Sequence, residues 1–318
     1  MKESIKLAAE VPPELDGERL DQAAARLFPD YSRSRLQTWI KTGELLVEGG
    51  QRRPRDKVNE GDALVVEAQL VVEVGWQAQE IPLDVIYEDE SILVLNKPAG
   101  LVVHPAAGHA DGTLVNALLA RVPELAQLPR AGIVHRLDMD TSGIMVVART
   151  LSAHHHLVAQ LQARTVKREY CAVCIGAMTG GGTVDAPMGR HPKQRKKMAV
   201  LLAGGKPAIT HYRVTRRFAN HTRIAVNLET GRTHQIRVHM AYRHYPLVGD
   251  ATYGGRPRIP KGASGELIDM LRGFPRQALH AQVLGLVHPE SGEELRFECP
   301  LPEDIIALLD VLDREDSA

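Results

Sequence analysis

Residues 132–148 read GIVHRLDMDTSGIMVVA, a charged loop between two short apolar runs. β-Branched residues on both sides of the loop, with a glycine beside each run, are typical of a strand, a loop and a second strand. The pattern therefore predicts strands at residues 132–134 and 144–147. We expect both strands to be buried and to hold the loop rigidly, and loops fixed by a scaffold are where chemistry tends to sit.

Asp138 is the residue of this loop with the clearest catalytic potential. Its carboxylate could act as a nucleophile or a general base, with Arg136 or another cation keeping it ionised. A structural interpretation competes with this one, because residues 140–143 (DTSG) are ordinary turn formers. The loop alone leaves both interpretations open.

The overall composition is that of an ordinary globular protein. The chain has 318 residues, 44% of them hydrophobic and 25% charged, which suits two domains. No apolar run approaches the roughly 18 residues needed to span a bilayer, and residues 1–20 lack the apolar core of a signal peptide. Three cysteines are too few for a disulfide framework. We expect a cytoplasmic protein without membrane partners, and a monomer by default.

Charge is balanced overall but not locally. Lys+Arg and Asp+Glu both number 39, yet residues 189–217 contain nine basic side chains and no acidic one. A local basic run can neutralise phosphates even in a neutral chain. A solvated basic loop fits the charge pattern equally well. The residues of this run that we expect to contact RNA are Lys193, Arg195, Lys196 and Lys197.

Residues 17–66 form a small module in this interpretation. Helical spacing predicts one helix over 19–28 and a second that starts at Ser32 and ends at Gly43. Strands are predicted at 45–51 and 62–68. The RLD at 19–21, the SRSR helix start at 32–35 and the LV at 46–47 leading to the GD at 61–62 resemble the S4 RNA-binding domain.

The second helix of this module gives it a possible RNA-binding face. A helix N-terminus that carries arginines is a physically sensible phosphate site, although a basic surface helix without RNA is the alternative. The expected contacts are Arg33, Arg35 and Lys41. We expect an S4-like domain of α/β type over residues 1–70, a linker over 71–80 and a catalytic domain over 81–318.

The pattern of the catalytic domain is mixed. Two strands are predicted within residues 84–96 and further strands at 167–176, 279–288 and 294–298, with helices at 113–120, 151–162 and 303–312. Residues 221–229 and 232–240 read as a hairpin, whose second strand would place Thr233, Gln235, Arg237 and His239 on one face. An arginine and a histidine on that face must be paired or point into a site.

Three further features could carry chemistry. His154, His155 and His156 are adjacent on a helix and so point in three directions, which prevents them from binding one metal ion. Cys171 and Cys174 lack the partners of a zinc or redox site, and buried strand cysteines are the simpler interpretation. Tyr170 could make a hydrogen bond in the core or face a site.

Three motifs in order suggest a family: NKPAGLVVHP at 96–105, HRLDMDTSG at 135–143 and GRTHQIRVH at 231–239. Their order and spacing resemble RluA-type pseudouridine synthases over nearly all of residues 81–300. The resemblance implies an α+β fold with a mixed, mainly antiparallel sheet and flanking helices. It implies a catalytic aspartate at Asp138, an active-site tyrosine near the base at Tyr170, which is a candidate for removing the C5 proton, and a carboxylate-pairing arginine at Arg237. Arg136 would fill the gap left by a flipped-out nucleotide.

The resemblance also implies a substrate. Enzymes of this type with an S4 module act on 23S ribosomal RNA of the large subunit, at the stem-loop called helix 69, and contribute to ribosome assembly. Isomerising uridine transfers no group and no electrons, so we expect neither cofactor nor metal. By their positions in or beside the three motifs, the remaining residues expected to contact RNA are His135, Thr141, Lys97, His104, Arg232, His234 and Gln235.

Two other functions compete with this one. The DMDT at 138–141 fits the D-x-D-x-T core of magnesium-dependent haloacid-dehalogenase-type phosphatases, but that motif should end an uninterrupted apolar strand, and His135 and Arg136 intervene. The later G-D-x-x-x-D that such enzymes need is also missing, because Gly254 stands at its last position. The other alternative is a non-catalytic RNA-binding or ribosome-assembly protein built on the S4-like module.

Overall fold

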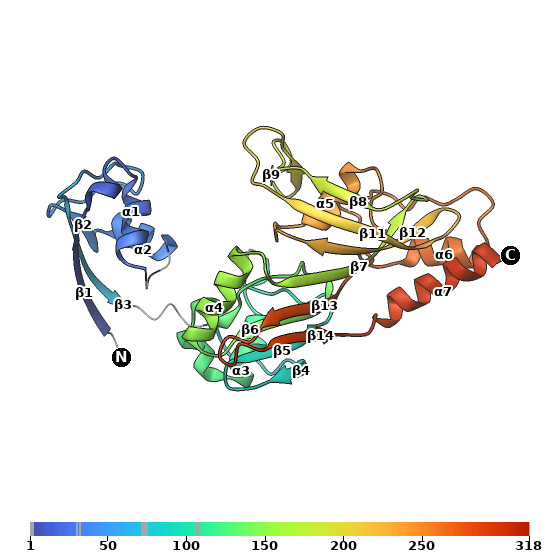
Figure 1. Cartoon of the computed structure of the whole chain (residues 1–318), viewed down its shortest axis with the longest axis horizontal. Coiled ribbons are helices and arrows are strands. Elements are labelled where there is room, and N and C mark those ends of the chain that lie inside the picture. Colours follow the sequence, from blue (N-terminus) through green and yellow to red (C-terminus); the bar gives the residue numbers. More distant parts are fainter. Residues whose placement is uncertain (1–2, 30, 32, 71–75, 106–107, 318) are drawn as a thin grey trace. The chain divides into compact units, whose positions relative to one another are not determined.

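The computed structural model describes residues 3–29, 31, 33–70, 76–105 and 108–317. The chain divides into two compact units, Met1–Gly75 and Trp76–Ala318, both drawn in Figure 1. Among the described residues, no helix is long and apolar enough to cross a membrane. Each unit has hydrophobic clusters of its own.

The N-terminal unit packs two helices on a three-stranded antiparallel sheet of order β1-β3-β2. The apolar stripes of the helices, including Leu20, Leu36 and Ile40, meet Leu64 and Val66 of the sheet in one core. The sequence predicts both helices and the last two strands but not the first strand. Ser32, the expected helix cap, lies outside the described residues. The elements are β1 (Glu3–Glu10), η1 (Pro13–Leu15), α1 (Leu20–Leu27), α2 (Arg33–Thr42), β2 (Leu45–Val47) and β3 (Ala63–Leu70).

The second unit is organised around a mixed sheet that runs β4-β5-β6-β13-β7-β12-β11-β8, with β14 paired to β13. Its pairs are antiparallel except for β6 and β13, which are parallel. A separate pair, β9 (Met188–Arg190) and β10 (Met198–Val200), lies beyond β8 in sequence. The main strands are β4 (Asp84–Glu88), β5 (Ile92–Lys97), β6 (Ser142–Ala148), β7 (Lys167–Ile175), β8 (Gly182–Asp185), β11 (Ile209–Arg217), β12 (His221–Leu228), β13 (Leu279–Val287) and β14 (Glu294–Glu298).

Helices cover both faces of this sheet because the central strands are apolar on both sides. Leu95 and Met145 share a core with α3, whereas Val94 and Val146, one residue away, pack against α4. α6 and α7 pack on the face of β7 that carries Val173. The helices are α3 (Leu114–Arg121), η2 (Pro123–Gln127), η3 (Pro129–Gly132), α4 (Leu151–Gln162), α5 (Gln235–Tyr242), α6 (Gly265–Gly273) and α7 (Glu303–Ser317).

The α+β class and the mainly antiparallel mixed sheet predicted from the sequence are confirmed. The start of the catalytic unit differs from the expected boundary. Residues 76–80, expected to belong to the linker, hydrogen-bond to this unit: the amide of Gln79 donates to the carbonyl of Asn116, and the Asn116 side chain donates to the carbonyl of Gln77. Residues 71–75 of the expected linker lie outside the described residues.

Two predicted strands are wrong. Residues 132–134 do not form one, because Arg130, Ala131 and Gly132 all have positive φ (53°, 52° and 77°) and make a 3-10 turn, which leaves Ile133 with a single bridge to Val147. Residues 232–240, the expected second strand of the hairpin, instead lead into α5. His234 (φ 58°) turns the chain before the helix, and Ile236 and Met240, four residues apart, both enter the core.

Candidate active site

A cleft of about 870 Å³ opens on the face of the sheet that carries Tyr170. It is lined by residues from the 135–141 loop, from β7 and from α5, which are far apart in the sequence. Asp138, Tyr170 and Arg237, the three expected catalytic residues, all line it. The fold therefore brings these side chains to one concave surface.

The loop that carries Asp138 is held by backbone contacts on both sides. The Lys97 ammonium and the amide of Gly100 both donate to the carbonyl of Met139, at 2.8 and 3.0 Å. On the other side, the Arg276 guanidinium donates to the carbonyl of Asp140 at 3.0 Å. These contacts fix the chain immediately after Asp138, so its carboxylate starts from a rigid backbone.

Gly143 determines where this loop joins β6. Its φ is +116°, and a Cβ at this position would lie 2.1 Å from the carbonyl oxygen of Ala281 on β13. No other residue fits such a close approach between the two parallel strands. Glycine therefore sets both the backbone turn and the spacing of the strands beneath the cleft.

Asp138 is paired with Arg237, which lies in the first turn of α5. The guanidinium Nη1 donates to Asp138 Oδ2 at 3.0 Å, while Nε and Nη2 donate to the two carboxylate oxygens of Asp250 at 2.7 and 2.9 Å. Burial lowers the pKa of Arg237, but the hydrogen bonds and charges of Asp250 and Asp138 outweigh this and raise it above its usual value. The arginine therefore stays charged and places a positive charge directly against the Asp138 carboxylate.

His234 lies on the other side of Asp138. Its Nε2 is 3.9 Å from Asp138 Oδ1, and its Nδ1 shares a hydrogen bond of 2.8 Å with the hydroxyl of Tyr253. Burial lowers the pKa of His234, although the charge on Asp138 opposes the shift. A largely neutral imidazole beside the carboxylate can accept or donate a hydrogen bond to a substrate.

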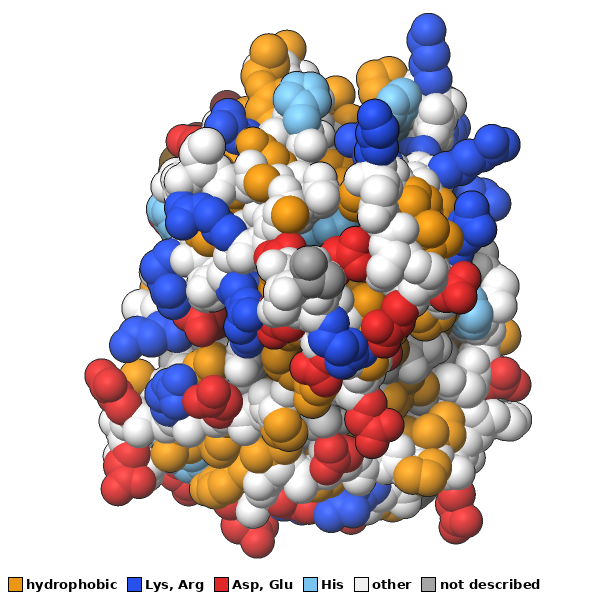
Figure 2. Space-filling model, turned by 90° about the vertical axis from the view of Figure 1, so that its right-hand side faces the viewer, with side chains coloured by type: hydrophobic (Ala, Val, Ile, Leu, Met, Phe, Trp, Pro, Cys, Tyr) orange, Lys and Arg blue, Asp and Glu red, His pale blue; other side chains and the backbone are white. Residues whose placement is uncertain are grey.

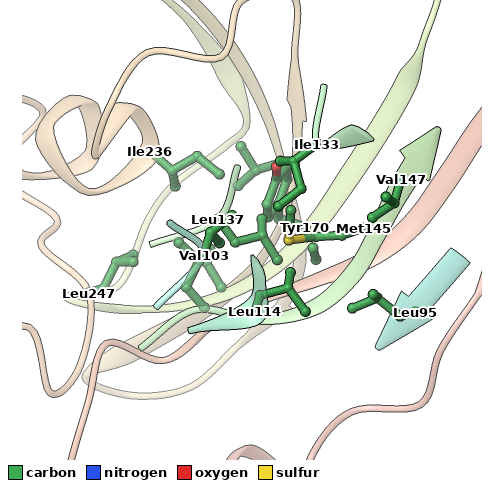
Figure 3. Close-up of a cluster of buried hydrophobic side chains, with 14 of the residues drawn as sticks. Leu95, Val103, Leu114, Ile133, Leu137, Met145, Val147, Tyr170, Ile236 and Leu247 are labelled. Carbon is green, nitrogen blue, oxygen red and sulfur yellow. The ribbon is translucent and has the colours of Figure 1, made fainter. Parts of the chain in front are cut away.

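Tyr170 stands among apolar side chains in the floor of the cleft. Its ring belongs to the main core, with Ile133, Leu137 and Met145 around it in Figure 3. The side chain is 6% exposed, and burial raises the pKa of its phenol. Tyr170 is therefore neutral near pH 7 and presents a flat apolar surface close to Asp138.

Most of the other expected contact residues of the catalytic unit line the same cleft. Burial lowers the pKa of His104 to about 4 and that of His135 to about 3, so both imidazoles are neutral near pH 7. His135 Nε2 also accepts a hydrogen bond of 3.1 Å from the amide of Val146. Arg136, Arg232 and His234 also line the cleft, as do Thr141 and Gln235, which are almost fully buried.

Three expected RNA contacts are corrected by the structure. Thr141 is 2% exposed, and its hydroxyl accepts a hydrogen bond of 3.1 Å from the Gln277 side chain. Lys97 has no exposed surface, and its ammonium donates to the carbonyls of Pro98, Leu101 and Met139 at 2.7–2.9 Å. Gln235 is 2% exposed, and its side-chain amide is hydrogen-bonded within the protein. The amide nitrogen donates to the carbonyl of Ile209, and the amide oxygen accepts from the Thr230 hydroxyl. Direct contact with RNA does not fit this burial. All three side chains organise the loops that surround the cleft.

The expected RNA contacts outside the cleft are on the surface. Lys193, Arg195 and Lys196 are exposed in the loop between β9 and β10, and Lys197 is half-buried. On the face shown in Figure 2, Lys and Arg side chains are more frequent towards the top and Asp and Glu side chains towards the bottom. Three of the four basic side chains of this loop are therefore accessible to an RNA backbone.

In the N-terminal unit the basic helix is partly neutralised. Arg33 donates to the buried carboxylate of Asp21 at 2.6 and 3.1 Å, and Arg19 and Gln37 donate to the same group. Burial raises the pKa of Asp21, but these hydrogen bonds lower it below its usual value. Lys41 is exposed at the end of α2. RNA contact by Arg33, Arg35 and Lys41 stays a prediction.

Sequence reasoning missed four residues that build the site: Asp250, Tyr253, Arg276 and Arg168. Asp250 is 3% exposed and anchors Arg237, and its Oδ1 also accepts from the amide of Tyr253 at 3.0 Å. A signal for it was present, since residues 247–255 (LVGDATYGG) place an aspartate between an apolar run and glycines. Among the described residues, no group of three or more His, Cys, Asp or Glu could hold a metal ion.

The fold and the site define an S4 domain followed by a pseudouridine synthase domain. The sequence model of the RNA pseudouridylate synthase family matches residues 91–242, and that of the S4 domain matches 18–64. The chain belongs to the RNA pseudouridylate synthase family and is an isomerase.

Individual relatives agree with this assignment. The chain is 62% identical over 317 residues to "Ribosomal large subunit pseudouridine synthase D" of Pseudomonas aeruginosa, covering 99% of each chain. It is 55% identical to the protein of that name from Vibrio parahaemolyticus, covering 99% of this chain and 97% of the relative. The solved structure of "Human RNA Pseudouridylate Synthase Domain Containing 4" is 25% identical, with a TM-score of 0.58, and covers 72% of this chain and 93% of that chain.

Proposed function

We propose that this enzyme converts specific uridines of large-subunit 23S ribosomal RNA to pseudouridine, with Asp138 as its catalytic carboxylate. The observation that carries the proposal is the Asp138 carboxylate, 3.0 Å from the Arg237 guanidinium and on the wall of the cleft that also contains Tyr170. The relatives named for the large ribosomal subunit support this choice of RNA.

The reaction breaks the bond from N1 of uracil to C1′ of ribose and forms one from C5 to C1′. N1 gains a proton and C5 loses one, so no oxidant, reductant or group donor is consumed. Positive charge develops at the ribose when uracil leaves, and an ionised carboxylate held at a fixed position stabilises it. Asp138 is that carboxylate, and its pairing with Arg237 holds it in position before the substrate arrives.

Tyr170 and the histidines hold the uracil in this proposal. Because the raised pKa of Tyr170 keeps its phenol protonated near pH 7, we assign it to packing against the base rather than to removing the C5 proton. The neutral His234, 3.9 Å from Asp138, is placed to hydrogen-bond to a base carbonyl or amide. Arg136, exposed at the rim of the cleft, would fill the gap that the target nucleotide leaves in its stack.

The target must leave its stack to reach the floor of the cleft, which costs a few kcal/mol and least for unpaired bases. We therefore propose a stem-loop target, namely helix 69, and binding to the large subunit or its assembly intermediates in the cytoplasm. The S4 domain favours an additional contribution to ribosome assembly, because an RNA-binding domain can act without catalysis.

The test is pseudouridine formation on unmodified ribosomal RNA, with a metal chelator present, by wild type, Asp138→Asn and Asp269→Asn. Asp269 is exposed on α6 and serves as the matched control for loss of one carboxylate. Activity in wild type and in the control, and none in Asp138→Asn, is the expected result. Activity in all three proteins would remove the catalytic role from Asp138. Inactivity of all three on free RNA and on large-subunit particles would refute the proposed function.

A further inference from the structure

Arg168 is a buried cation in the cleft with almost no partners. It is two residues before Tyr170 on β7, so both side chains point to the same face of the strand, and both line the cleft. The residue is 8% exposed. Within the described residues, its Nε has no hydrogen-bond partner, and its Nη2 makes a marginal contact of 3.5 Å with the carbonyl of Leu228.

No carboxylate among the described residues of the cleft is free to neutralise Arg168. Two acidic residues line the cleft among the described residues, Asp138 and Glu229. Asp138 is paired with Arg237 at 3.0 Å, and Glu229 binds Arg164 at 2.8 Å and His211 at 2.7 Å. A guanidinium buried without a counter-charge costs free energy, and proteins accept that cost where function requires it.

Gly231 shows that the guanidinium has a defined position. A Cβ at residue 231 would lie 2.9 Å from Nη1 of Arg168, so the arginine packs directly against this part of the GRTHQ loop. The φ of Gly231 is not in the left-handed region, and its missing side chain therefore makes room for Arg168 rather than for a turn. A methyl group at residue 231 would displace the guanidinium without removing its charge.

We propose that Arg168 binds a phosphodiester group of the RNA strand beside the target nucleotide. This rests on the proposed function, since it assumes that the cleft receives RNA. Phosphates are the anions that RNA brings into the cleft, and the planar fork of a guanidinium matches a phosphate in two-point contact. When the nucleotide enters, its phosphate supplies the negative charge that Arg168 lacks. This contact fixes the RNA backbone so that the target uracil lies over Tyr170.

The test combines a protein change with a backbone change. Stem-loop RNAs are made with a neutral methylphosphonate at each phosphate near the target uridine in turn, and binding and turnover are measured for wild type, Arg168→Met and Arg168→Lys. In wild type, the methylphosphonate at one position should lower kcat/KM on the order of tenfold to a hundredfold, as expected for loss of a charged hydrogen bond. Arg168→Met should have this lower kcat/KM with every RNA, and the methylphosphonate at the sensitive position should lower it no further. Arg168→Lys should recover part of it.

Binding provides a readout that does not depend on catalysis. Arg168→Met should reduce the slope of log affinity against log salt by about one phosphate contact, that is by ~0.7, whereas Arg296→Met, at an exposed pair on β14, should leave it unchanged. Equal methylphosphonate sensitivity of wild type and Arg168→Met at all positions, with equal salt slopes, would overturn the proposal. A wild type that binds RNA with the expected slope but forms no pseudouridine on any substrate would instead count against the proposed function.

Stability separates a phosphate ligand from a structural arginine. If Arg168 serves RNA, removing its buried charge should leave the melting temperature unchanged or higher, and a clear decrease would indicate a structural role. Gly231→Ala supplies a second variant that keeps the charge. It should weaken the same methylphosphonate effect by displacing the guanidinium, and an unchanged effect would also contradict the proposal.

Discussion

Asp250 holds Arg237 by both of its carboxylate oxygens, at 2.7 and 2.9 Å, and leaves one guanidinium nitrogen to point into the cleft. That nitrogen meets Asp138 at 3.0 Å. Asp250 is buried and also accepts hydrogen bonds from the amides of Thr252 and Tyr253. The arginine is therefore positioned by a structural carboxylate before it pairs with the catalytic one.

This arrangement predicts different effects for the two aspartates. Asp250→Asn leaves a buried arginine without its main partner and should lower the free energy of unfolding by about 3–5 kcal/mol, together with kcat. Asp138→Asn should abolish turnover but change stability little, because Arg237 remains paired with Asp250. Urea unfolding of both variants beside wild type measures this. Equal stability losses in the two variants would show that Asp250 has no special anchoring role.

Part of this site could be predicted from sequence because short motifs carry it. Asp138 lies in a loop bounded by an apolar run, and Asp138 and Arg237 each belong to one of the three ordered motifs. Tyr170 lies outside these motifs, and only the family resemblance pointed to it. The sequence context marks Asp250, but its role could not be assigned, because its partner Arg237 is 13 residues away on a helix whose position depends on tertiary packing. Arg168 is likewise unremarkable among the residues of its strand, since its isolation appears only when the neighbouring carboxylates are known to be paired.

The two wrong strands have different causes. Every residue of 235–240 is buried, so polar and apolar residues alternate without marking an outer face, and this two-residue period is typical of a strand. At 132–134, two non-glycine residues in the left-handed region, Arg130 and Ala131, shorten the predicted strand to one bridge. Residues adopt this region only when surrounding structure imposes it, and a local pattern does not report that.

Buried histidines predict sensitivity to acid. His221 and His280 are each 1% exposed, and burial lowers the pKa of both to about 4 from 6.5. Above pH 6.5 neither state binds the proton. Between pH 6.5 and 4 the unfolded chain takes it up and the folded chain does not, so stability should fall by about 1.4 kcal/mol per pH unit for each histidine.

Urea unfolding at pH 7.0, 6.0 and 5.0 measures this loss. His221→Gln should make the free energy of unfolding fall less steeply with falling pH, by the contribution of one histidine. His221 suits the substitution because its Nε2 has no hydrogen-bond partner within the described part of the chain. The idea fails if the variant loses stability with falling pH as steeply as wild type does.

The loop between β9 and β10 is expected to contact phosphates. Replacing its four basic residues by glutamine should weaken RNA binding and reduce the slope of log affinity against log salt by up to about 3. The residues are Lys193, Arg195, Lys196 and Lys197. The matched control removes four arginines that are paired with carboxylates elsewhere, namely Arg121, Arg216, Arg296 and Arg314. A slope that changes equally in both proteins would mean that net charge, not this loop, sets the affinity.

The separate core of the N-terminal unit predicts that residues 1–75 can be removed without unfolding the rest. Among the described residues, its apolar cluster contains residues from 5–68 alone, and the cores of the second unit include none of them. The truncated chain, 76–318, should unfold cooperatively, with a melting temperature close to that of the catalytic unit in the full-length chain. Because Asp138, Tyr170 and Arg237 all lie in this part, it should still form pseudouridine on a short stem-loop.

On ribosomal RNA the truncation should raise KM more than it lowers kcat, since the S4 domain is expected to supply affinity and selectivity rather than reacting groups. The matched control is the full-length chain with Arg33, Arg35 and Lys41 replaced by glutamine, which keeps the domain but removes its basic helix face. Similar KM values for the truncation and for this variant would place the RNA contacts on α2. A folded truncation with no activity on any RNA would show that the S4 domain takes part in assembling the catalytic complex.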